Sequence, residues 1–323
     1  MSPCYAVVDS GTTRTRLRVW RDDAVQWTGS RSVGARDTAL DGNTDKVVAA
    51  LRELLETSAA RPTAIICSGM ITSNMGLFEL PHLPAPASRD DVAAGMRQKS
   101  FTDLSEVPLS FVPGVKTLPA GNGLAGLAAG DVLRGEEAEI AGLHDMLGLD
   151  RSTVYLHIGS HHKAIEVDVD GSILGSRTAV TGELLAAILG NTILKSSVVE
   201  LDGLALDFEA ALAGAHAARD HGFGRALFLV RVGEQLAGLG RDRMTSYLLG
   251  ALASLDLSLL TAADPDAPVV VYGGDVFPRI LVALLKEAGV NDVRVVEQGM
   301  ADTAAAMGAV KLYELARELG VVA

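Results

Sequence analysis

One local pattern occurs twice in this chain, and it constrains the fold more than any other feature. Residues 5–8 form a short apolar run that ends in the segment Asp9-Ser10-Gly11-Thr12-Thr13. Residues 16–20 then alternate polar and apolar side chains, as a strand with one buried face does. A strand, a turn rich in Gly and Thr, and a returning strand together predict a β-hairpin at the start of a sheet.

The same pattern restarts near Asp150. Residues 154–158 are mostly apolar and meet the turn Gly159-Ser160-His161-His162, after which residues 164–169 alternate again. Two sheets that each open with such a hairpin predict a duplicated α/β fold, with domains at residues 1–149 and 150–323. Because ligands commonly bind in clefts between domains, we expect the site between the two copies.

The spacing of apolar residues separates the remaining helices from strands. Helical spacing covers residues 45–58, 136–147, 207–218, 223–239, 243–260 and 303–319. Short apolar runs at residues 25–27, 64–67 and 268–272 predict strands, and the Pro-rich residues 81–88 predict an irregular connection. At 323 residues, the chain is long enough for two domains with ample core.

The charge balance excludes some classes of partner. Lys and Arg total 28 against 40 Asp and Glu, a formal net charge of −12. Such a surface repels polyanions, so we expect neither nucleic acid nor an anionic membrane as a partner. Apolar runs are too short for a membrane helix, and Cys4 and Cys67 lack CxxC spacing. Without a basic leader before the first strand, the sequence predicts a cytoplasmic protein with reduced, buried thiols.

The two turns could each hold phosphate. In the first, Gly11 lets the backbone approach an anion, Thr12 and Thr13 supply donors, and the Asp9 carboxylate could hold hydrated Mg²⁺. The second offers Gly159, Ser160 and His161 beside the cation of Lys163. Each could equally be an ordinary hairpin turn, the second with solvated histidines. The histidines lack the partners of a metal site, and the SxxK spacing lacks the companion motifs of an acyl-transfer enzyme.

Three further segments carry candidate residues. Asp131 and Arg134-Gly135-Glu136-Glu137 put carboxylates and a guanidinium at the start of a predicted helix, either as a general base or as helix-dipole compensation. Gly273-Gly274 follows a buried strand, where a flat ligand could lie or the chain could simply turn. The GxGxxG match from Gly121 to Gly126 follows no strand, which favours a loop over a dinucleotide site.

These segments, in this order, resemble the 2-keto-3-deoxy-galactonokinase family of actin-like ATPases and sugar kinases. The resemblance spans nearly the whole chain and is most specific at Arg134-Gly135-Glu136-Glu137. It also includes Asp9 to Thr13 with Arg16, residues 69–76, Gly159 to Lys163, residues 181–184 and residues 228–250. The chain departs from the family at Ser10, where Trp is usual, and at Leu77 and Ala164, where an aromatic is usual.

The resemblance implies two actin-like (ribonuclease H-like) domains and ATP-dependent phosphorylation of the 6-hydroxyl of 2-dehydro-3-deoxy-D-galactonate, in galactonate catabolism. By analogy, Asp9 orients Mg²⁺, and Glu136 takes the hydroxyl proton, with Glu137 and Asp131 as rivals. The implied phosphate ligands are Gly11, Thr12, Thr13, Arg16, Gly159, Ser160, His161 and Lys163, and Gly273 and Gly274 would flank adenine. Candidates for the sugar acid are Gly69, Met70, Ser73, Asn74 and Arg134.

Two alternatives stay open at this point. A kinase of the same fold could act on another sugar acid, such as 2-dehydro-3-deoxygluconate, since one hydroxyl configuration separates the two substrates. A non-catalytic sensor that binds nucleotide or sugar could use the same scaffold. The sequence also leaves a homodimer open.

Overall fold

The computed structural model describes residues 2–260, 266–274 and 276–323. Its chain forms two compact units. Unit 1 contains Met1–Ser152, Glu166–Ser176 and Gly299–Ala323, and unit 2 contains Thr153–Ile165 and Arg177–Gln298. Unit 1 therefore includes residues from both sides of position 150, whereas all residues of unit 2 follow it. The domain boundary between residues 149 and 150 stays a prediction.

Unit 1 is built on a six-stranded sheet in the order β3-β2-β1-β4-β7-β6. Its strands are β1 (Tyr5–Ser10), β2 (Thr15–Arg21), β3 (Ala24–Arg31), β4 (Ala64–Gly69), β6 (Arg97–Lys99) and β7 (Leu109–Phe111). Strands β1 and β2 form the predicted hairpin, and β4 runs parallel to β1 in register from Tyr5↔Ala64 to Ser10↔Gly69. This register brings the carboxyl ends of β1 and β4 to the same edge of the sheet.

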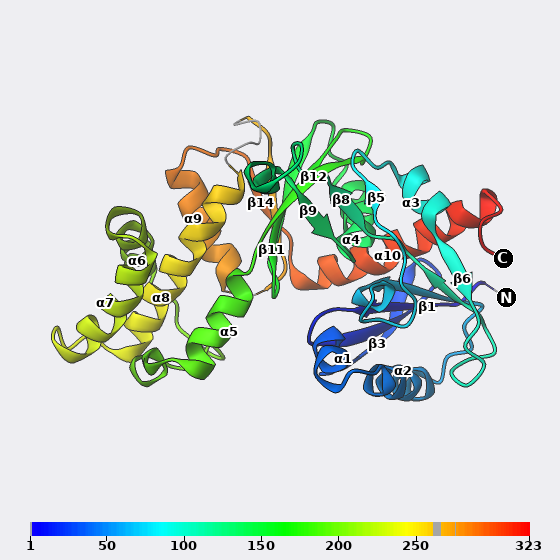
Figure 1. Ribbon diagram of the computed structural model, residues 1–323, viewed down its shortest axis with the longest axis horizontal. Coiled ribbons are helices and arrows are strands. Elements are labelled where there is room, and N and C mark those ends of the chain that lie inside the picture. Colours follow the sequence, from blue (N-terminus) through cyan, green and yellow to red (C-terminus); the bar gives the residue numbers. More distant parts are fainter. Residues whose placement is uncertain (1, 261–265, 275) are drawn as a thin grey trace. The chain divides into compact units, whose positions relative to one another are not determined.

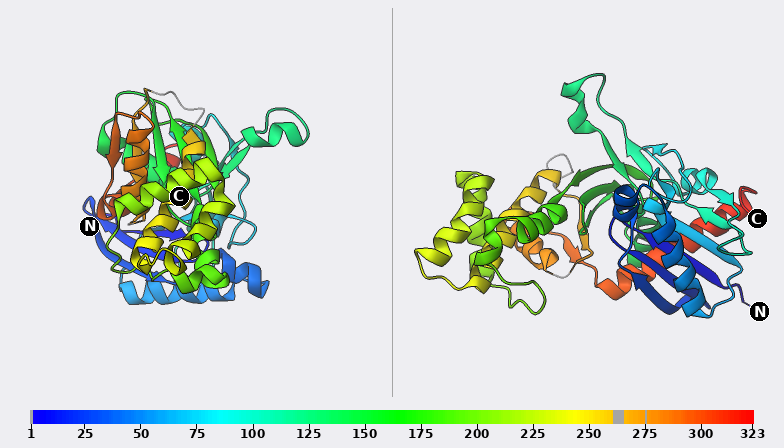
Figure 2. Two further views of the ribbon diagram at one scale, coloured as in Figure 1. Left: turned by 90° about the vertical axis from the view of Figure 1, so that its left-hand side faces the viewer. Right: turned by 60° about the horizontal axis from the view of Figure 1, so that its bottom comes forward.

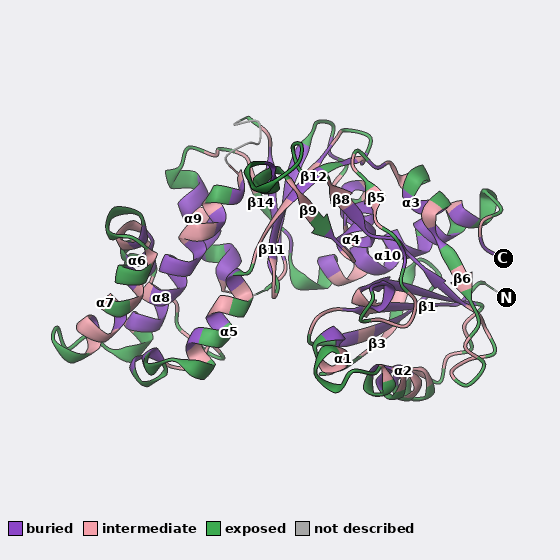
Figure 3. Cartoon of the chain, in the orientation of Figure 1, coloured by how far each residue is buried: buried purple, intermediate pink, exposed green. Residues whose placement is uncertain are grey.

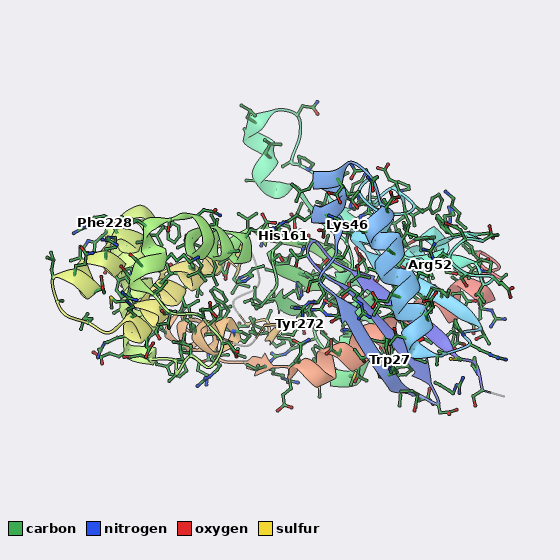
Figure 4. The ribbon with its side chains drawn as sticks, turned by 90° about the horizontal axis from the view of Figure 1, so that it is seen from below. Trp27, Lys46, Arg52, His161, Phe228 and Tyr272 are labelled. Atoms are coloured by element: carbon green, nitrogen blue, oxygen red, sulfur yellow. The ribbon has the colours of Figure 1, made fainter. Side chains whose placement is uncertain are left out.

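Helices cover both faces of this sheet (Figure 1), with α2 (Asp45–Ser58) on one face and α10 (Gln298–Glu318) on the other. The predicted helix at residues 45–58 is confirmed, because Val47, Leu51 and Leu54 recur on one side and bury there. The side-chain view shows Lys46 and Arg52 on α2 and Trp27 on the neighbouring strand β3 (Figure 4). Figure 3 shows the resulting contrast between the buried central strands and the exposed outer side of α2.

A small second sheet in unit 1 joins the first sheet to the helix α4 (Glu136–Leu147). Its order is β5-β8-β9, from Leu83–Pro84, Val115–Thr117 and Asp131–Leu133. The Pro-rich connection predicted as irregular thus contains the short strand β5. The chain between β8 and β9 projects as an arm (Figure 2) and carries the short 3₁₀ helix η2 (Leu124–Ala129) at the GxGxxG match. The remaining helices here are α1 (Ala35–Asp41), η1 (Met70–Thr72) and α3 (Arg89–Gly95).

Unit 2 is organised around a five-stranded sheet in the order β12-β11-β10-β13-β14. These strands are β10 (Thr153–His157), β11 (His162–Val167), β12 (Ile173–Ala179), β13 (Val269–Tyr272) and β14 (Val293–Val295). The chain passes between the units within β11 and β12. The first five strands of the unit 1 order, β3-β2-β1-β4-β7, follow the same sequence of connections. The duplicated α/β fold is therefore confirmed.

The unit 2 helices complete the core of that unit. They are α5 (Thr181–Asn191), η3 (Ile193–Ser197), α6 (Phe208–His221), α7 (Phe223–Gln235), α8 (Arg241–Asp256), η4 (Leu257–Leu260) and α9 (Phe277–Glu287). Leu248, Leu249 and Leu252 of α8 are fully buried in the core cluster of this unit. Among the helices of the described ranges, none is long and apolar enough to cross a bilayer. Cys4 and Cys67 are buried free thiols, as predicted.

Candidate active site

The start of α1 anchors the first turn of unit 1 through backbone hydrogen bonds. The Gly11 amide donates to the Arg14 carbonyl at 2.9 Å and closes the turn. The Ala35 amide donates to the Gly11 carbonyl at 3.1 Å, and the Arg36 amide donates to the Thr12 carbonyl at 2.9 Å. A Cβ on Gly34 would lie 2.5 Å from the Gly11 carbonyl oxygen, so only glycine fits there. The turn therefore has a fixed backbone conformation, as an anion-binding loop needs.

Asp9 lies at the carboxyl end of β1, opposite Arg16 on β2. The Arg16 guanidinium Nη1 donates to Asp9 Oδ2 at 3.2 Å. The other carboxylate oxygen faces Gly69 at the end of β4, where a Cβ would lie 3.2 Å from Asp9 Oδ1 and 2.5 Å from the Ser10 carbonyl oxygen. Gly69 has φ +85°, which side-chain-bearing residues rarely adopt. The two strand ends thus pack backbone to backbone beside the Asp9 carboxylate.

Gly69 is also the contact point for the segment before α4. A Cβ on Gly135 would lie 3.1 Å from the Gly69 Cα. This approach brings the first turn of α4, with Glu136 and Glu137, to the carboxyl end of β4. Asp9, Gly69, Gly135 and Glu136 therefore belong to one local group, although the sequence separates them widely. The structure brings these predicted site residues of unit 1 together.

Arg134 holds the loop that follows Gly69. Its Nη1 donates to the carbonyl and the hydroxyl of Thr72, and its Nη2 donates to the Leu80 carbonyl at 2.9 Å. The same Nη2 lies 3.2 Å from both ring nitrogens of His82. Burial and the adjacent guanidinium lower the pKa of His82 to about 4, so its ring is neutral at physiological pH. The guanidinium closes this loop into a fixed shape.

The other predicted sugar-acid residues lie on that loop. Ser73 is buried, and its hydroxyl donates to the Met70 carbonyl at 2.7 Å and accepts from the Met75 amide at 3.1 Å. Asn74, the next residue, is exposed, and Met70 is half-buried. The exposed side chain of Asn74 therefore extends from a loop backbone whose conformation Ser73 and Arg134 fix.

The three candidate carboxylates have different surroundings. Glu137 is buried and accepts at both oxygens, from the Val115 amide at 2.9 Å and the Gly135 amide at 2.6 Å. Burial, together with the negative charge of Glu136, raises the pKa of Glu137 to about 7. Glu136 is 6% exposed, and its Oε2 accepts from the Arg134 amide at 3.0 Å.

Asp131 lies elsewhere than predicted. It begins the strand β9 rather than belonging to the start of α4, and its Oδ2 accepts from the Ser176 hydroxyl at 2.6 Å. Its cross-strand partner is Thr117 on β8. The short strand forms because β8 offers a pairing edge that residue spacing does not reveal. The start of α4 at Glu136 agrees with the prediction.

The turn of unit 2 repeats the contacts of the turn in unit 1. The Glu183 amide, in the first turn of α5, donates to the Ser160 carbonyl at 3.0 Å. A Cβ on Gly182 would lie 2.2 Å from the Gly159 carbonyl oxygen, as one on Gly34 would approach Gly11. Gly159, Ser160 and His161 thus form a second anchored turn. Gly34 and Gly182 were not predicted as site residues, although a glycine directly before or within the first turn of a helix is the signal that could find them.

Gly273 reproduces in unit 2 the contact that Gly69 makes in unit 1. It follows β13 with φ +81°, and its Cβ would lie 2.4 Å from the Ile158 carbonyl oxygen. Gly274 packs on the Ile158 side chain, where a Cβ would be 3.1 Å from Cγ2. Figure 4 labels Tyr272 just before this pair and His161 in the turn. The predicted phosphate turn and the predicted adenine segment therefore meet within unit 2.

The side chains after Ser160 differ in exposure. His161 is partly exposed and its Nε2 lies 3.2 Å from Glu183 Oε1. Lys163 is only 8% exposed, on β11. His162, which the hairpin interpretation treated as solvated, is fully buried, and its Nδ1 lies 2.6 Å from Asp256 Oδ2. That interpretation was wrong for His162, because the strand β11 begins at this residue and turns its side chain into the core.

Known proteins resemble this chain in sequence and in backbone structure. The model of a family described as 2-keto-3-deoxy-galactonokinase matches residues 9–312. The 2-dehydro-3-deoxygalactonokinase of Escherichia coli (strain K12) is 26% identical over 263 residues, which are 80% of each chain. A solved structure proposed as a 2-dehydro-3-deoxygalactonokinase, from Sinorhizobium meliloti, is 26% identical, with TM-score 0.73 over 98% of this chain and 100% of that one.

A more distant solved structure shares the fold. Component A of the (R)-2-hydroxyglutaryl-CoA dehydratase of Acidaminococcus fermentans has TM-score 0.58 at 13% identity. The similarity covers 98% of this chain and 99% of that one. At this identity the likeness concerns the backbone architecture alone.

Proposed function

The chain belongs to the 2-keto-3-deoxy-galactonokinase family and is a carbohydrate kinase, and on that premise we propose that it phosphorylates the 6-hydroxyl of 2-dehydro-3-deoxy-D-galactonate with ATP. The sugar acid of galactonate catabolism supplies the acceptor hydroxyl, and the γ-phosphoryl group of ATP is transferred to it. The chain of contacts from Asp9 through Gly69 and Gly135 to Glu136 carries this proposal, since it joins a candidate metal ligand to a candidate base.

Glu136 is the residue we assign as general base. Glu136 follows Gly135, whose backbone contacts Gly69 beside Asp9, whereas the Glu137 carboxylate anchors backbone amides at both oxygens and Asp131 binds Ser176 on another sheet. Glu136 takes the proton of the 6-hydroxyl as that oxygen forms its bond to the γ-phosphorus. The bond to the β,γ-bridging oxygen breaks, and ADP leaves with that electron pair.

The nucleotide would be held by the two anchored turns and by Gly273-Gly274. Gly11, Thr12 and Thr13 in one turn, and Gly159, Ser160 and His161 in the other, supply amide and hydroxyl donors to phosphate oxygens. Arg16 and Lys163 add positive charge. Gly273 and Gly274 have no side chains, so an adenine ring could lie against their backbone.

The single carboxylate of Asp9 fits a Mg²⁺ ion that binds together with the nucleotide. Among the residues described, none form a group of three or more His, Cys, Asp or Glu side chains that could hold an ion. Mg²⁺ in kinases is held largely by phosphates and water with one or two carboxylates, and Asp9 provides one. When bound, the ion would neutralise charge on the transferred phosphoryl group. Arg16 keeps the Asp9 carboxylate oriented through their 3.2 Å ion pair.

The sugar acid would be recognised by the loop after Gly69. Asn74 offers an amide to the substrate, and the backbone of Gly69, Met70 and Ser73 offers further polar groups. Arg134 would act chiefly by fixing this loop, because its guanidinium already bonds to Thr72 and Leu80. A substrate carboxylate would then meet a preformed set of donors.

The test is an ATP-coupled assay of the native chain and three variants against a panel of 2-keto-3-deoxy sugar acids. We expect the galacto substrate to give the highest kcat/KM. Glu136→Gln should lower kcat by about 10²–10⁴-fold with little change in either KM. Glu137→Gln and Asp131→Asn, the matched controls, should keep kcat within about tenfold of native.

Two outcomes would contradict the proposal. Preference for 2-dehydro-3-deoxygluconate would reassign the substrate while leaving the kinase chemistry intact. Full activity of Glu136→Gln, with loss of activity in one of the two controls, would move the base to that other carboxylate.

A further inference from the structure

A fully buried histidine and aspartate lie directly behind the phosphate turn of unit 2. His162 opens β11, Asp256 ends α8, and both have no exposed surface. His162 Nδ1 donates to Asp256 Oδ2 at 2.6 Å, and the Thr181 hydroxyl donates to Asp256 Oδ1 at 2.6 Å. Thr181, also fully buried, is the first residue of α5. One carboxylate therefore ties together three elements of the unit.

These three residues close a ring around the turn. After Thr181, Gly182 presses against the Gly159 carbonyl, and the Glu183 amide donates to the Ser160 carbonyl at 3.0 Å. From Ser160 the chain returns through His161 to His162. Every link of this ring is a covalent bond, a hydrogen bond or a backbone contact. The turn cannot shift without breaking one of them.

The imidazole also contacts the start of α9, the helix that follows the Gly273-Gly274 pair proposed for adenine. Its ring packs edge-on against Phe277, with centroids 4.9 Å apart and planes at 81°. Phe277 is the first residue of α9 and follows Gly273 and Gly274 closely in the chain. His162 thus directly follows the turn, contacts the start of α9 and, through Asp256, is linked to the start of α5.

A buried polar network of this kind is expensive as a purely structural device. Removing a carboxylate and an imidazole from water is unfavourable, and apolar side chains of similar volume often stabilise a core equally well. His162 Nε2 has no hydrogen-bond partner among the residues the structure describes, which adds to that cost. What the network does provide is a rigid, directional geometry.

We infer that His162, Asp256 and Thr181 are positioning residues for the nucleotide. They hold the turn at Gly159–His161 and the start of α9 in the geometry that receives phosphate and adenine. This inference rests on the proposed function to the extent that unit 2 binds ATP. It adds residues outside the nucleotide-contacting set and assigns them an effect on nucleotide binding alone.

The experiment compares Thr181→Val with Thr181→Ser. Valine keeps the volume and removes the hydroxyl that Asp256 accepts, whereas serine keeps the hydroxyl. Calorimetry with MgADP and with a non-hydrolysable ATP analogue measures binding without turnover, and steady-state kinetics gives both KM values. We expect Thr181→Val to weaken nucleotide binding by about tenfold or more, since a hydrogen bond to a charged group is lost. Thr181→Ser should restore binding to within about threefold, and the KM for the sugar acid should stay within about twofold in both.

Thr245→Val is the matched control. Thr245 is also buried in unit 2, and its hydroxyl donates to the Arg241 carbonyl at 2.9 Å and accepts from the Val199 amide at 2.9 Å. Neither contact touches the turn. We expect this variant to lower the melting temperature to the same extent as Thr181→Val without weakening nucleotide binding.

The outcomes separate this inference from the proposed function. If Thr181→Val binds nucleotide as tightly as the native chain, or if Thr245→Val weakens binding equally, the positioning role is overturned while the kinase assignment stands. If the native chain binds nucleotide but phosphorylates no sugar acid, the substrate proposal fails, and the Thr181 pair still decides the positioning role. A native chain that binds no nucleotide overturns both.

Discussion

Glu136 and Glu137 are neighbours in the first turn of α4, but the protein holds their carboxylates differently. Glu137 receives two backbone amides, from β8 and from the residue before the helix. It therefore ties the start of α4 to the small sheet, and Glu136 is positioned by that anchoring. Glu137 therefore has a structural role, and Glu136 has the proposed chemical role.

The stability of the protein should depend on the protonation of Glu137. Because burial and Glu136 raise the pKa of Glu137 to about 7, the folded chain binds this proton more tightly than the unfolded chain. The stabilisation is present below the unfolded pKa of about 4.3 and is lost as the pH rises towards 7. Relative to Glu137→Gln, the native free energy of unfolding should therefore fall by about 3 kcal/mol between roughly pH 4.5 and pH 8.

Denaturant unfolding at a series of pH values measures this difference. Glu53→Gln is the control, since Arg31 lowers the pKa of the exposed Glu53 and its effect has the opposite sign. Relative to Glu53→Gln, the native free energy of unfolding should decrease as the pH falls, rather than as it rises. A difference between native and Glu137→Gln that is constant with pH would contradict the prediction.

For individual residues, local signals in the sequence identified the candidate segments but not the groups that those segments contact. The Arg134 to Glu137 segment was predicted at a helix start, and α4 begins there. That Arg134 bonds to Thr72 and Leu80 depends on packing between segments far apart in the sequence, which no spacing rule encodes. The burial of His162 likewise depends on the strand β11 beginning two residues before the alternation that starts at Ala164.

Among the elements, the helix α4 is held by a close crossing with α10. A Cβ on Gly142 would lie 1.9 Å from the Ala304 carbonyl oxygen, and one on Gly308 would lie 1.9 Å from that of Ala138. The two glycines are reciprocal, each facing the backbone of the other helix. The crossing therefore depends on a backbone-to-backbone approach, and it fixes the helix that carries Glu136.

Gly308→Ala should force these helices apart. We expect a loss of about 1–3 kcal/mol in the free energy of unfolding, with a lower kcat because α4 shifts. Gly190→Ala in α5 is the matched control, since nothing lies within 4 Å of the added Cβ. It should instead gain about 0.5–1 kcal/mol, as alanine is the better helix former. Thermal and denaturant unfolding measure both, and equal stability of the two variants would contradict the crossing argument.

Elements with strong periodicity were predictable, and short ones were not. The bounds of α2 and α4 agree with the apolar spacing, although α2 buries one stripe and α4 is buried on nearly all sides from Glu136 to His144. The helices α1 and α3 span seven residues each, too few for a period to be recognised. The strands β5, β6 and β9 form because neighbouring strands offer hydrogen bonds, and their sequences alone carry no such signal.

Across the whole molecule, the two units share a set of backbone contacts, although the sequences of the two halves have little in common. Ser10, Gly11, Gly34 and Gly69 in unit 1 make the same backbone contacts as Ile158, Gly159, Gly182 and Gly273 in unit 2. Sequence identity between the halves is negligible, so only the strand–turn–strand pattern could reveal the repeat. The fold class followed from that pattern, whereas the matched glycine contacts required the structure.

Hydrogen–deuterium exchange should distinguish the two ligands by the segments that each one protects. With Mg²⁺ and a non-hydrolysable ATP analogue, we expect slower exchange at residues 158–162 and 182–184 of unit 2, because phosphate contacts rigidify the turn. The sugar acid alone should slow exchange at residues 69–76 of unit 1. Residues 223–235 in α7 provide the internal control. Protection of unit 2 by the sugar acid alone would contradict the assignment.

The path of the chain through the two units also governs how the protein can be divided. The helix α10 belongs with unit 1, although it ends the chain, and it crosses α4 through Gly142 and Gly308. A break between residues 149 and 150 would leave those two helices on separate fragments. Neither fragment could bury the crossing alone, so the acid-bearing helix would be restored only when both are present. Two fragments divided at this position would form a split enzyme, and its kinase activity would measure how much of the two fragments had reassociated.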